Sequence, residues 1–435
     1  MIRILRFGDE EFERYLKQLD GRMEGESREI EKEVFSIIEK VRREGDRALL
    51  HYTSQFDQIH LSPSELLIPR QEIKEAYKKI PPPFLKTLEK ASSRIRRFHQ
   101  LTKKTIHPRW VERGIRIEQI MRPLDRVGLY IPGGKASYPS TVLMASIPAK
   151  VAGVKELILT TPPQPGGISP AVLVAADLAG VHRIFQVGGV QAIGALAYGT
   201  ETIPRVDKIV GPGNRYVAMA KRLVYGKVDI DMIAGPSEIV IVSDGETHPS
   251  FIASDLLSQA EHDEMALPIL ITSSESFAKK VKEELERQLR SLKRSRIARA
   301  SLHRRGALLV VKDLSQAIEV ANRIAPEHVE LSVRKPHTLK KAIRNAGAVF
   351  LGPYTPEALG DYLAGPNHIL PTLGTARFFS PLGVEDFYKR IHFIQFDRKR
   401  LIQFAEDVER FTRWEGLEGH YRAIQSRLKE KKEPS

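Results

Sequence analysis

Cysteine is absent from this sequence of 435 residues. Without thiols, the chain cannot form disulfide bridges or cysteine-ligated zinc and iron–sulfur centres. It also cannot hold a substrate as a thiohemiacetal or an acyl thioester. Any metal ion bound by side chains would therefore need ligands from His, Asp, Glu, Asn or Gln.

Long hydrophobic runs are absent as well. No apolar segment approaches the roughly 18 residues that a membrane-spanning helix requires. The apolar patch at the N-terminus is interrupted by Arg3, Arg6 and Asp9, so it lacks the hydrophobic region of a signal peptide. We therefore expect a cytoplasmic protein with no membrane partner.

Aromatic residues make up only 7% of the chain, and the positive charge is spread thinly. The 68 Lys and Arg residues exceed the 54 Asp and Glu residues, which leaves a formal net charge of +14. The densest basic stretches, residues 293–305 and 429–432, contain no aromatic residues on which nucleic-acid bases could stack. We interpret them as solvated surface and expect no nucleic-acid partner. A general attraction for anionic cofactors or substrates stays open.

Short β-branched runs indicate the fold class. Residues 25–105 show the apolar spacing of helices, whereas β-branched runs alternate with helical segments of roughly ten to eighteen residues after Arg116. This alternation is typical of βαβ units on parallel sheets. A seam at residues 235–237 separates two such units, so we predict two parallel sheets. The alternation stops after Ser380, and the rest of the chain is predicted to end in a helical tail from about residue 398.

Three glycine turns follow predicted strands, at residues 131–134, 187–191 and 210–214. Ligands of parallel sheets bind beyond the carboxyl ends of the strands, where these turns lie. The third turn contains Gly211 and Gly213 but no further glycine, so the G-x-G-x-x-G fingerprint is incomplete. Each turn alone also fits a tight connection that binds nothing. Three turns in one unit favour a nucleotide site of a non-standard type.

Residues 251–263 (FIASDLLSQAEHD) place polar side chains on a predicted helix. Gln259 and His262 are three residues apart and share a face, and Asp255 lies one turn earlier. Such a face suits a metal ion or catalysis, although a single histidine on a helix also occurs as a surface or capping residue. The segment is not an H-E-x-x-H motif, which disfavours an ordinary zinc protease.

Three further clusters combine acidic residues with histidine. Glu327 and His328 directly follow a proline, and a stiff turn of this kind suits two proton-transfer groups of different pKa. Asp361 and His368 lie in a predicted loop that is long for a compact domain, and such loops often carry function. The tail contains WEGLEGH at residues 414–420. Taken singly, these clusters also fit solvated loops or the end of an amphipathic helix.

The order of the segments identifies a family. From about residue 25 to the tail, the chain resembles the L-histidinol dehydrogenases of histidine biosynthesis. The resemblance rests on these blocks in this order: GLYIPGG, YPSTVLMASIPAKVAG, VGGVQAIGALAYGT, KIVGPGNRYV, IDMIAGPSE, ASDLLSQAEHD, PEHVEL, GDYLAGPNHILPT and EGLEGH. It implies an NAD-dependent oxidoreductase that uses one zinc ion per subunit and two successive NAD+ molecules to oxidise L-histidinol through L-histidinaldehyde to L-histidine.

The resemblance also implies roles for the residues of the matching blocks. The implied zinc ligands are Gln259, His262, Asp361 and His420. The implied acid–base pair is Glu327 and His328. The implied substrate contacts are Ser237, Gln259, His262, His328, Asp361, Glu415 and His420, with His368 a weaker candidate for the wall of the site. The implied NAD+ contacts are Tyr130, Gln191 and Asn214.

Pattern and resemblance together predict an α/β protein with two Rossmann-like parallel-sheet domains and helical N- and C-terminal extensions. The expected boundaries are an extension over 1–25, a metal and substrate domain over 26–129 plus 237–380, an NAD-binding domain over 130–236, and a C-terminal helical arm over 381–435. The family implies a homodimer in which Glu415 and His420 act in the partner's site. The first 25 residues match no block of the family.

The chemistry can be divided between the two members of the acid–base pair. His328 would take the hydroxyl proton in the first oxidation, and Glu327 would activate the water that hydrates the aldehyde. A chain without cysteine can oxidise that hydrate directly. Three alternatives stay open: a zinc hydrolase with Glu327 as its base, a binding protein without oxidoreductase activity, and a nucleic-acid-binding protein.

Overall fold

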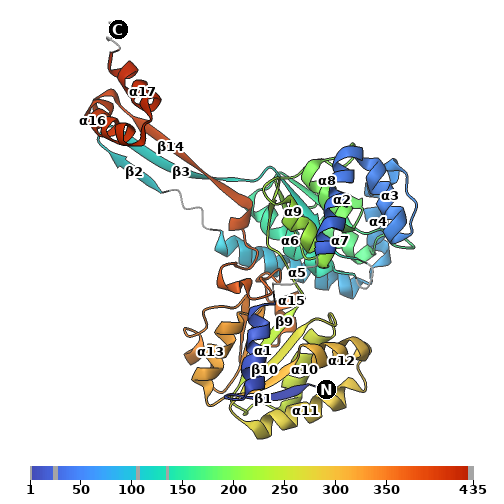
Figure 1. Ribbon diagram of the computed structural model, residues 1–435. Coiled ribbons are helices and arrows are strands. Elements are labelled where there is room, and N and C mark those ends of the chain that lie inside the picture. Colours follow the sequence, from blue (N-terminus) through green and yellow to red (C-terminus); the bar gives the residue numbers. More distant parts are fainter. Residues whose placement is uncertain (1, 23–27, 104–107, 134–136, 430–435) are drawn as a thin grey trace. The chain divides into compact units, whose positions relative to one another are not determined.

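The computed structural model describes residues 2–22, 28–103, 108–133 and 137–429. Sequence predictions at residues 23–25, at residue 134 and at residues 430–432 lie outside these ranges. The chain forms two compact units (Figure 1). The larger unit comprises Met1–Lys103 and Leu124–Phe387, and the smaller unit comprises Lys104–Pro123 and Tyr388–Ser435.

The larger unit contains a parallel sheet of six strands. Their order is β1 (Arg3–Arg6), β11 (Ala307–Val310), β10 (Leu267–Thr272), β9 (Glu238–Ser243), β12 (His328–Ser332) and β13 (Ala348–Leu351). The helices α1 (Glu10–Asp20) and α13 (Leu314–Ile324) pack on one face. The other face is covered by α10 (Pro249–Ala260), α11 (Glu275–Leu289) and α12 (Ser295–Arg304).

Strand β9 shows why this sheet is buried on both sides. Ile239 and Ile241 belong to the core under α10, whereas Val240 and Val242 belong to the core under α13. Successive side chains of a strand point to opposite faces, so a run of β-branched residues supplies both cores.

The larger unit also contains a parallel sheet of five strands. Their order is β6 (Arg183–Gln186), β5 (Glu156–Thr161), β4 (Arg126–Tyr130), β7 (Lys208–Val210) and β8 (Asp229–Ile230). One face packs against α2 (Arg28–Glu44), α3 (Asp46–Asp57), α8 (Gly189–Tyr198) and α9 (Arg215–Val224). On the other side, α6 (Pro139–Ala152) packs on β4 and β5 and contacts α5 (Pro82–Thr102) and α7 (Pro170–Ala179), which in turn contacts α4 (Arg70–Lys79).

Both sheets have the Rossmann order. If β9 and β4 are each counted as strand 1 of their sheet, the strands of both sheets stand in the order 3-2-1-4-5. The six-stranded sheet has β1 as an additional strand beside β11. The prediction of two Rossmann-like parallel sheets is therefore confirmed. Shorter elements complete the larger unit: α14 (Pro336–Leu339), α15 (Glu357–Tyr362) and three turns of 3₁₀-helix at Pro63–Glu65, Thr375–Arg377 and Glu385–Phe387.

Residues 1–25 were predicted to form a separate helical extension, and α1 confirms a helix within them, but the described part of the segment packs into the larger unit. Strand β1 pairs with β11 in parallel register, and its Leu5 is buried in the core under α1 and α13. A strand of only four residues carries too little pattern to be recognised without its partner.

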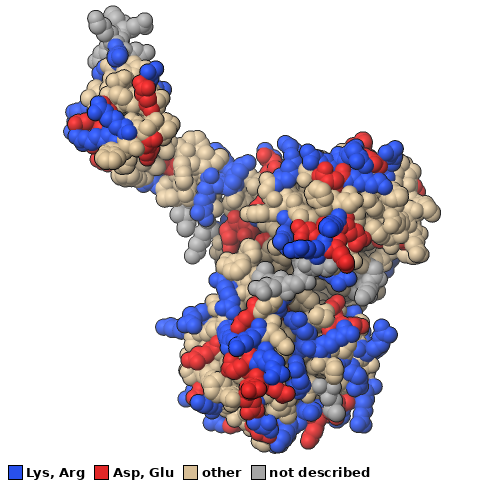
Figure 2. Space-filling view, viewed as in Figure 1, with Lys and Arg blue, Asp and Glu red and all other residues tan. Residues whose placement is uncertain are grey.

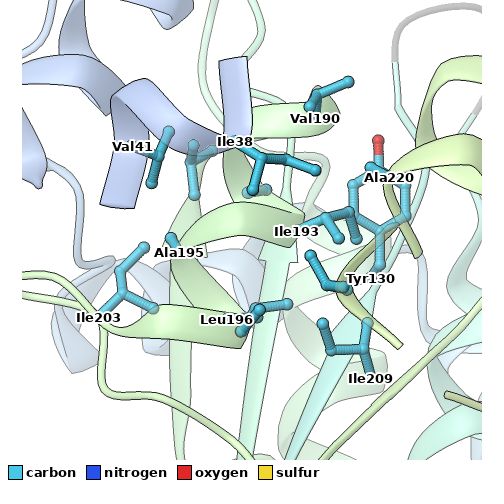
Figure 3. Packing of buried hydrophobic residues seen from close by; sticks show 14 of the residues in the cluster. Ile38, Val41, Tyr130, Val190, Ile193, Ala195, Leu196, Ile203, Ile209 and Ala220 are labelled. Carbon is cyan, nitrogen blue, oxygen red and sulfur yellow. The ribbon is translucent and has the colours of Figure 1, made fainter. Parts of the chain in front are cut away.

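The helices of residues 28–102 also depart from the predicted boundaries, because they pack around the five-stranded sheet. Figure 3 shows Ile38 of α2 beside Ile193 of α8, and Val41 of α2 belongs to the same hydrophobic cluster. The two helices approach closely at Gly194, where an added Cβ would lie 3.3 Å from Val41. The apolar stripe of α2 was predicted correctly, but helical spacing alone does not specify which sheet covers the stripe.

The smaller unit is an antiparallel sheet followed by two helices. Its strand order is β14 (Tyr388–Phe396), β3 (Ile115–Pro123) and β2 (Arg109–Glu112). Helices α16 (Arg398–Glu415) and α17 (Glu418–Lys429) confirm the predicted helical tail. Strand β14 was not predicted, because its partner β3 lies far away in the sequence. None of the helices in the described ranges is both long and apolar enough to cross a membrane.

Candidate active site

Glu327 and His328 lie at the amino-terminal edge of the six-stranded sheet. Helix α13 ends at Ile324, Ala325 adopts the left-handed conformation with φ 49°, and β12 begins at His328. A left-handed non-glycine residue is uncommon, and such strain persists where the surrounding structure enforces it. The turn buries both side chains of the pair in the protein.

The backbone of Glu238, at the start of β9, holds both members of the pair. Its N–H donates a hydrogen bond of 2.9 Å to Oε2 of Glu327. Its carbonyl oxygen lies 3.0 Å from Nδ1 of His328. A carbonyl oxygen can only accept, so Nδ1 carries the proton and Nε2 of a neutral ring is left to accept one.

Two carboxylates of the short helix α15 face this imidazole. Nε2 of His328 lies 3.9 Å from Oε1 of Glu357. Ligand atoms of His328, Glu357 and Asp361 all lie within 4.8 Å of one another. Nδ1 of His368 lies 3.7 Å from Oδ1 of Asp361, so His368 adjoins the same cluster.

Glu357 was missed by the sequence analysis. The available signal was its spacing from Asp361, because residues four apart lie on one face of a helix. Its side chain is buried, and its backbone N–H donates a hydrogen bond of 2.8 Å to Glu330.

Burial shifts the titration of these groups toward their neutral forms. Desolvation raises the pKa of Glu327 well above its ordinary value, and the nearby carboxylate of Asp361 adds to this. Desolvation likewise raises the pKa of Glu357 to about 7 and raises the pKa of Asp361. It lowers the pKa of His328, although the charge of Glu357 opposes this. A bound cation could take neutral imidazoles and closely spaced carboxylates as ligands, because its charge stabilises them.

Gln259 and His262 occupy the end of α10. Gln259 is buried, and its Oε1 has no hydrogen-bond partner among the described residues. His262 is exposed. Burial lowers the pKa of His368 to about 4 and lowers the pKa of His328, and the charge of His262 adds a smaller effect in the same direction. An unpaired amide oxygen is costly unless a ligand satisfies it. By donor type, these atoms and the carboxylate of Asp361 suit a divalent metal ion such as zinc, although the metal-capable cluster that the described residues bring together is His328, Glu357 and Asp361.

The remaining predicted residues of the catalytic site lie in different surroundings. Ser237 is half-buried directly before β9, and its carbonyl oxygen accepts a hydrogen bond of 2.9 Å from Leu267. Glu415 ends α16, and His420 lies in the first turn of α17. Both are exposed in the smaller unit, so the predicted site residues are divided between the two units.

The predicted NAD+ contacts gather at the carboxyl edge of the five-stranded sheet. Tyr130 ends β4, and its hydroxyl accepts a hydrogen bond of 3.2 Å from the N–H of Gly189. Gln191 is fully buried beside Gly189, and both of its amide atoms lack partners among the described residues. Asn214 accepts hydrogen bonds from the first turn of α9. This edge includes the point between β4 and β7 where strand order reverses, the usual ligand crevice of such sheets.

Comparison with known proteins shows the family of this chain. The family model described as histidinol dehydrogenase matches residues 21–428. The histidinol dehydrogenase of Syntrophotalea carbinolica is 51% identical over 430 residues, which cover 99% of this chain and 100% of that protein. That of Geobacter sulfurreducens is 51% identical over 429 residues, covering 98% and 100%. A crystal structure of histidinol dehydrogenase from Elizabethkingia anophelis is similar with a TM-score of 0.91 at 36% identity, and the match covers 98% of both chains.

Proposed function

The chain belongs to the histidinol dehydrogenase family of NAD-dependent oxidoreductases, and from this premise we propose its reaction in detail. It oxidises L-histidinol through L-histidinaldehyde to L-histidine, with one zinc ion and two molecules of NAD+. The observation that carries this proposal is the buried Glu327–His328 pair, held by the backbone of Glu238 beside the carboxylates of Glu357 and Asp361.

The proposed ligands of the metal ion are Gln259, His262 and Asp361. The proposed fourth ligand is His420, from the smaller unit of the partner chain. The fit rests on the buried and unpaired Oε1 of Gln259 and on the crowded carboxylates of α15. When bound, zinc would orient the imidazole and amine of the substrate, and NAD+ would accept a hydride in each oxidation.

His328 serves as the base of the first oxidation. Its Nε2 accepts the hydroxyl proton of the substrate, while Nδ1 keeps its own proton and donates it in the hydrogen bond to the carbonyl oxygen of Glu238. Because burial keeps the imidazole neutral, it is ready to accept that proton near neutral pH. The alcohol thereby becomes an aldehyde after losing one proton and one hydride.

Glu327 serves at the second stage, in which water adds to the aldehyde. Its carboxylate takes a proton from that water as the oxygen adds to the aldehyde. The resulting hydrate then gives a hydroxyl proton to His328 and a second hydride to NAD+, which leaves the carboxylic acid. The raised pKa of Glu327 makes its ionised form a stronger base than an ordinary carboxylate. One water and two hydride transfers therefore account for the four-electron oxidation.

The cofactor residues are Tyr130, Gln191 and Asn214. The unpaired amide of Gln191 supports this assignment, because a buried amide without partners calls for a polar ligand. An edge without the G-x-G-x-x-G turn offers fewer phosphate contacts. Weak binding is useful here, because the first NADH must leave the site before the second NAD+ can bind.

The protein is further proposed to be a cytoplasmic homodimer in which Glu415 and His420 act in the partner's site, Glu415 by pairing with a cationic group of the substrate. Support comes from the smaller unit, which exposes large apolar side chains. Trp110 is 60% exposed, Phe411 70% and Trp414 93%. Exposed apolar residues in such number mark interaction surfaces.

Nucleic acid is not the proposed partner. On the face shown in Figure 2, Lys and Arg side chains are interspersed with Asp and Glu. A phosphate backbone is usually tracked by a patch or stripe of positive charge alone. The positive excess is therefore assigned to surface solvation and to the attraction of anionic ligands.

The test measures NADH formed per L-histidinol consumed by the purified protein, before chelation, after chelation and after zinc is restored. We expect two NADH per substrate, loss of turnover on chelation and recovery with zinc. One NADH per substrate would contradict the second oxidation, and no NADH under any metal condition would contradict the function.

A matched pair of variants tests the metal ligands. His262→Ala should lower the bound zinc measured by mass spectrometry. Asp263→Ala should retain it, because Asp263 is an exposed neighbour whose carboxylate accepts a hydrogen bond from the backbone of Met265. Equal zinc content in the two variants would remove His262 from the ligand set.

A further inference from the structure

Arg22 lies two residues after the end of α1, and its side chain is only 2% exposed. Its guanidinium donates to both carboxylate oxygens of Glu238, over 2.8 Å and 3.3 Å. It also donates to the carbonyl oxygens of Leu19 at 2.8 Å and of Ile324 at 2.6 Å. A planar guanidinium suits this arrangement, because its donors form a rigid fork.

Glu238 and Ile324, the two partners of Arg22 that are distant in sequence, both lie next to the acid–base pair. Glu238 supplies the backbone N–H that binds Glu327 and the carbonyl oxygen that binds His328. Ile324 is the last residue of α13 and lies three residues before Glu327, on the turn that contains the left-handed Ala325. Arg22 thus holds the two backbone segments that meet at the pair.

Stability alone is a weak explanation for this ion pair. A buried ion pair often gains little over apolar residues of similar size, because removing both charges from water costs about as much as their attraction returns. The position of the pair is more informative. Hydrogen-bond partners behind a reactive imidazole set its tautomer and orientation, and losing them typically costs activity.

We propose that Arg22 is a positioning residue for Glu327 and His328, which it aligns through the carboxylate of Glu238 and the carbonyl oxygen of Ile324. It touches no reacting atom. This inference rests on the proposed function, because the pair it positions is the acid–base pair of that reaction. It assigns a role to the N-terminal segment, for which no family block had suggested one.

The test compares Arg22→Met with Arg323→Met in the full-length, zinc-loaded protein. Arg323 is a matched control, because it also joins α13 to α1, through Asp20 at 2.8 Å and Glu13 at 3.5 Å. It lies on the partly exposed side and has no described contact with Glu238.

We expect kcat of Arg22→Met to fall roughly 10- to 100-fold, as for other residues that orient a reactive group. KM for L-histidinol and for NAD+ and the zinc content should stay near the wild-type values, because the lost interaction acts on the reacting geometry. Arg323→Met should keep kcat near wild type. Arg22→Lys should give an intermediate kcat, since it retains the charge without the fork.

Several outcomes would overturn the proposal. One is a kcat of Arg22→Met equal to that of Arg323→Met, and another is a loss explained fully by the unfolded fraction seen by circular dichroism. If Arg22→Met and Arg22→Lys both fail to fold, the role of Arg22 is stability and the proposal is wrong. If the wild-type protein itself forms no NADH from L-histidinol, the proposed function is wrong, and the role of Arg22 that rests on it is wrong with it. This outcome is distinguished from the others because it does not depend on the variants.

Discussion

Lys221 donates a hydrogen bond of 3.0 Å to the carbonyl oxygen of Gly211, and both groups are buried. The same ammonium group pairs with the buried carboxylate of Asp231, whose Oδ2 accepts a hydrogen bond of 2.7 Å from the N–H of Gly211. Both polar backbone groups of Gly211 are therefore held by one ion pair. Gly211 has φ 117° and packs against the carbonyl oxygen of Tyr130, so no other residue fits this turn without strain.

The first prediction is that this ion pair supports NAD+ binding. The double variant Lys221→Met with Asp231→Asn removes both charges, so neither is left buried and unpaired. We expect the Kd for NAD+ to rise about tenfold, which corresponds to about 1.4 kcal/mol of lost binding free energy. Binding is measured by titration calorimetry on protein shown to be folded.

The control is Lys208→Met. Lys208 pairs with the half-exposed Asp229 at 2.8 Å, in the same sheet and away from the turn. The NAD+ affinity of Lys208→Met should stay near wild type. The affinity for L-histidinol should be unchanged in Lys208→Met and in the double variant. An unchanged Kd for NAD+ in the double variant would show that the turn holds its shape without the pair.

The second prediction separates the members of the acid–base pair. His328→Asn should slow the first hydride transfer by roughly 10²- to 10⁴-fold, the usual contribution of a general base. Glu327→Gln should spare that step and slow the second, so that L-histidinaldehyde accumulates or escapes. Rapid-quench analysis of one turnover measures both steps. Wild-type rates for both steps in Glu327→Gln would refute this division of labour.

The third prediction concerns the smaller unit. His328→Ala and His420→Ala should each be inactive alone. If His420 acts in the partner's site, a mixture of the two proteins should regain part of the wild-type activity, because a heterodimer contains one intact site. Subunit exchange is verified with differently tagged chains. Verified exchange without recovery would mean that each site is built from one chain.

The fourth prediction concerns His99, a buried histidine of α5. Both of its ring nitrogens lack hydrogen-bond partners among the described residues. Burial lowers the pKa of His99 from 6.5 to about 4. Between these values the unfolded chain binds a proton that the folded protein does not, so acidification through this range destabilises the fold. A shift of this size corresponds to about 3 kcal/mol when complete.

We therefore expect His99→Leu to lose less unfolding free energy than wild type when the pH falls from 7 toward 4. Urea unfolding of the metal-free proteins measures this difference, and the same comparison at pH 8 serves as the reference, since imidazole is neutral in both states there. Parallel pH curves for the two proteins would show that His99 does not titrate on unfolding.

Much of the fold was predictable, because its elements repeat strong local patterns. The β-branched runs at residues 238–243 and 267–272 are buried strands, as expected. Strand β12 was not expected, because His328 and Glu330 interrupt its apolar pattern. Both are nevertheless buried, which became possible only where Glu238 and Glu357 supply hydrogen-bonding groups.

The candidate site was predictable only in part. The blocks of the family indicated Asp361, Glu327 and His328, and the structure brings these residues close together. They gave no indication of Glu357, because a single acidic residue after a proline resembles an ordinary helix start. The trans roles of Glu415 and His420 stay predictions.

By itself, the sequence determined the absence of thiol chemistry, the period of each strand and helix, and the order of blocks that establishes the family. These properties depend on composition or on neighbours within a few residues. The tertiary structure decided that Arg22 meets Glu238, 216 residues later, and that α2 covers the five-stranded sheet. Such meetings depend on how the whole chain buries its apolar surface and pairs its charges, and no local pattern encodes which distant groups come together.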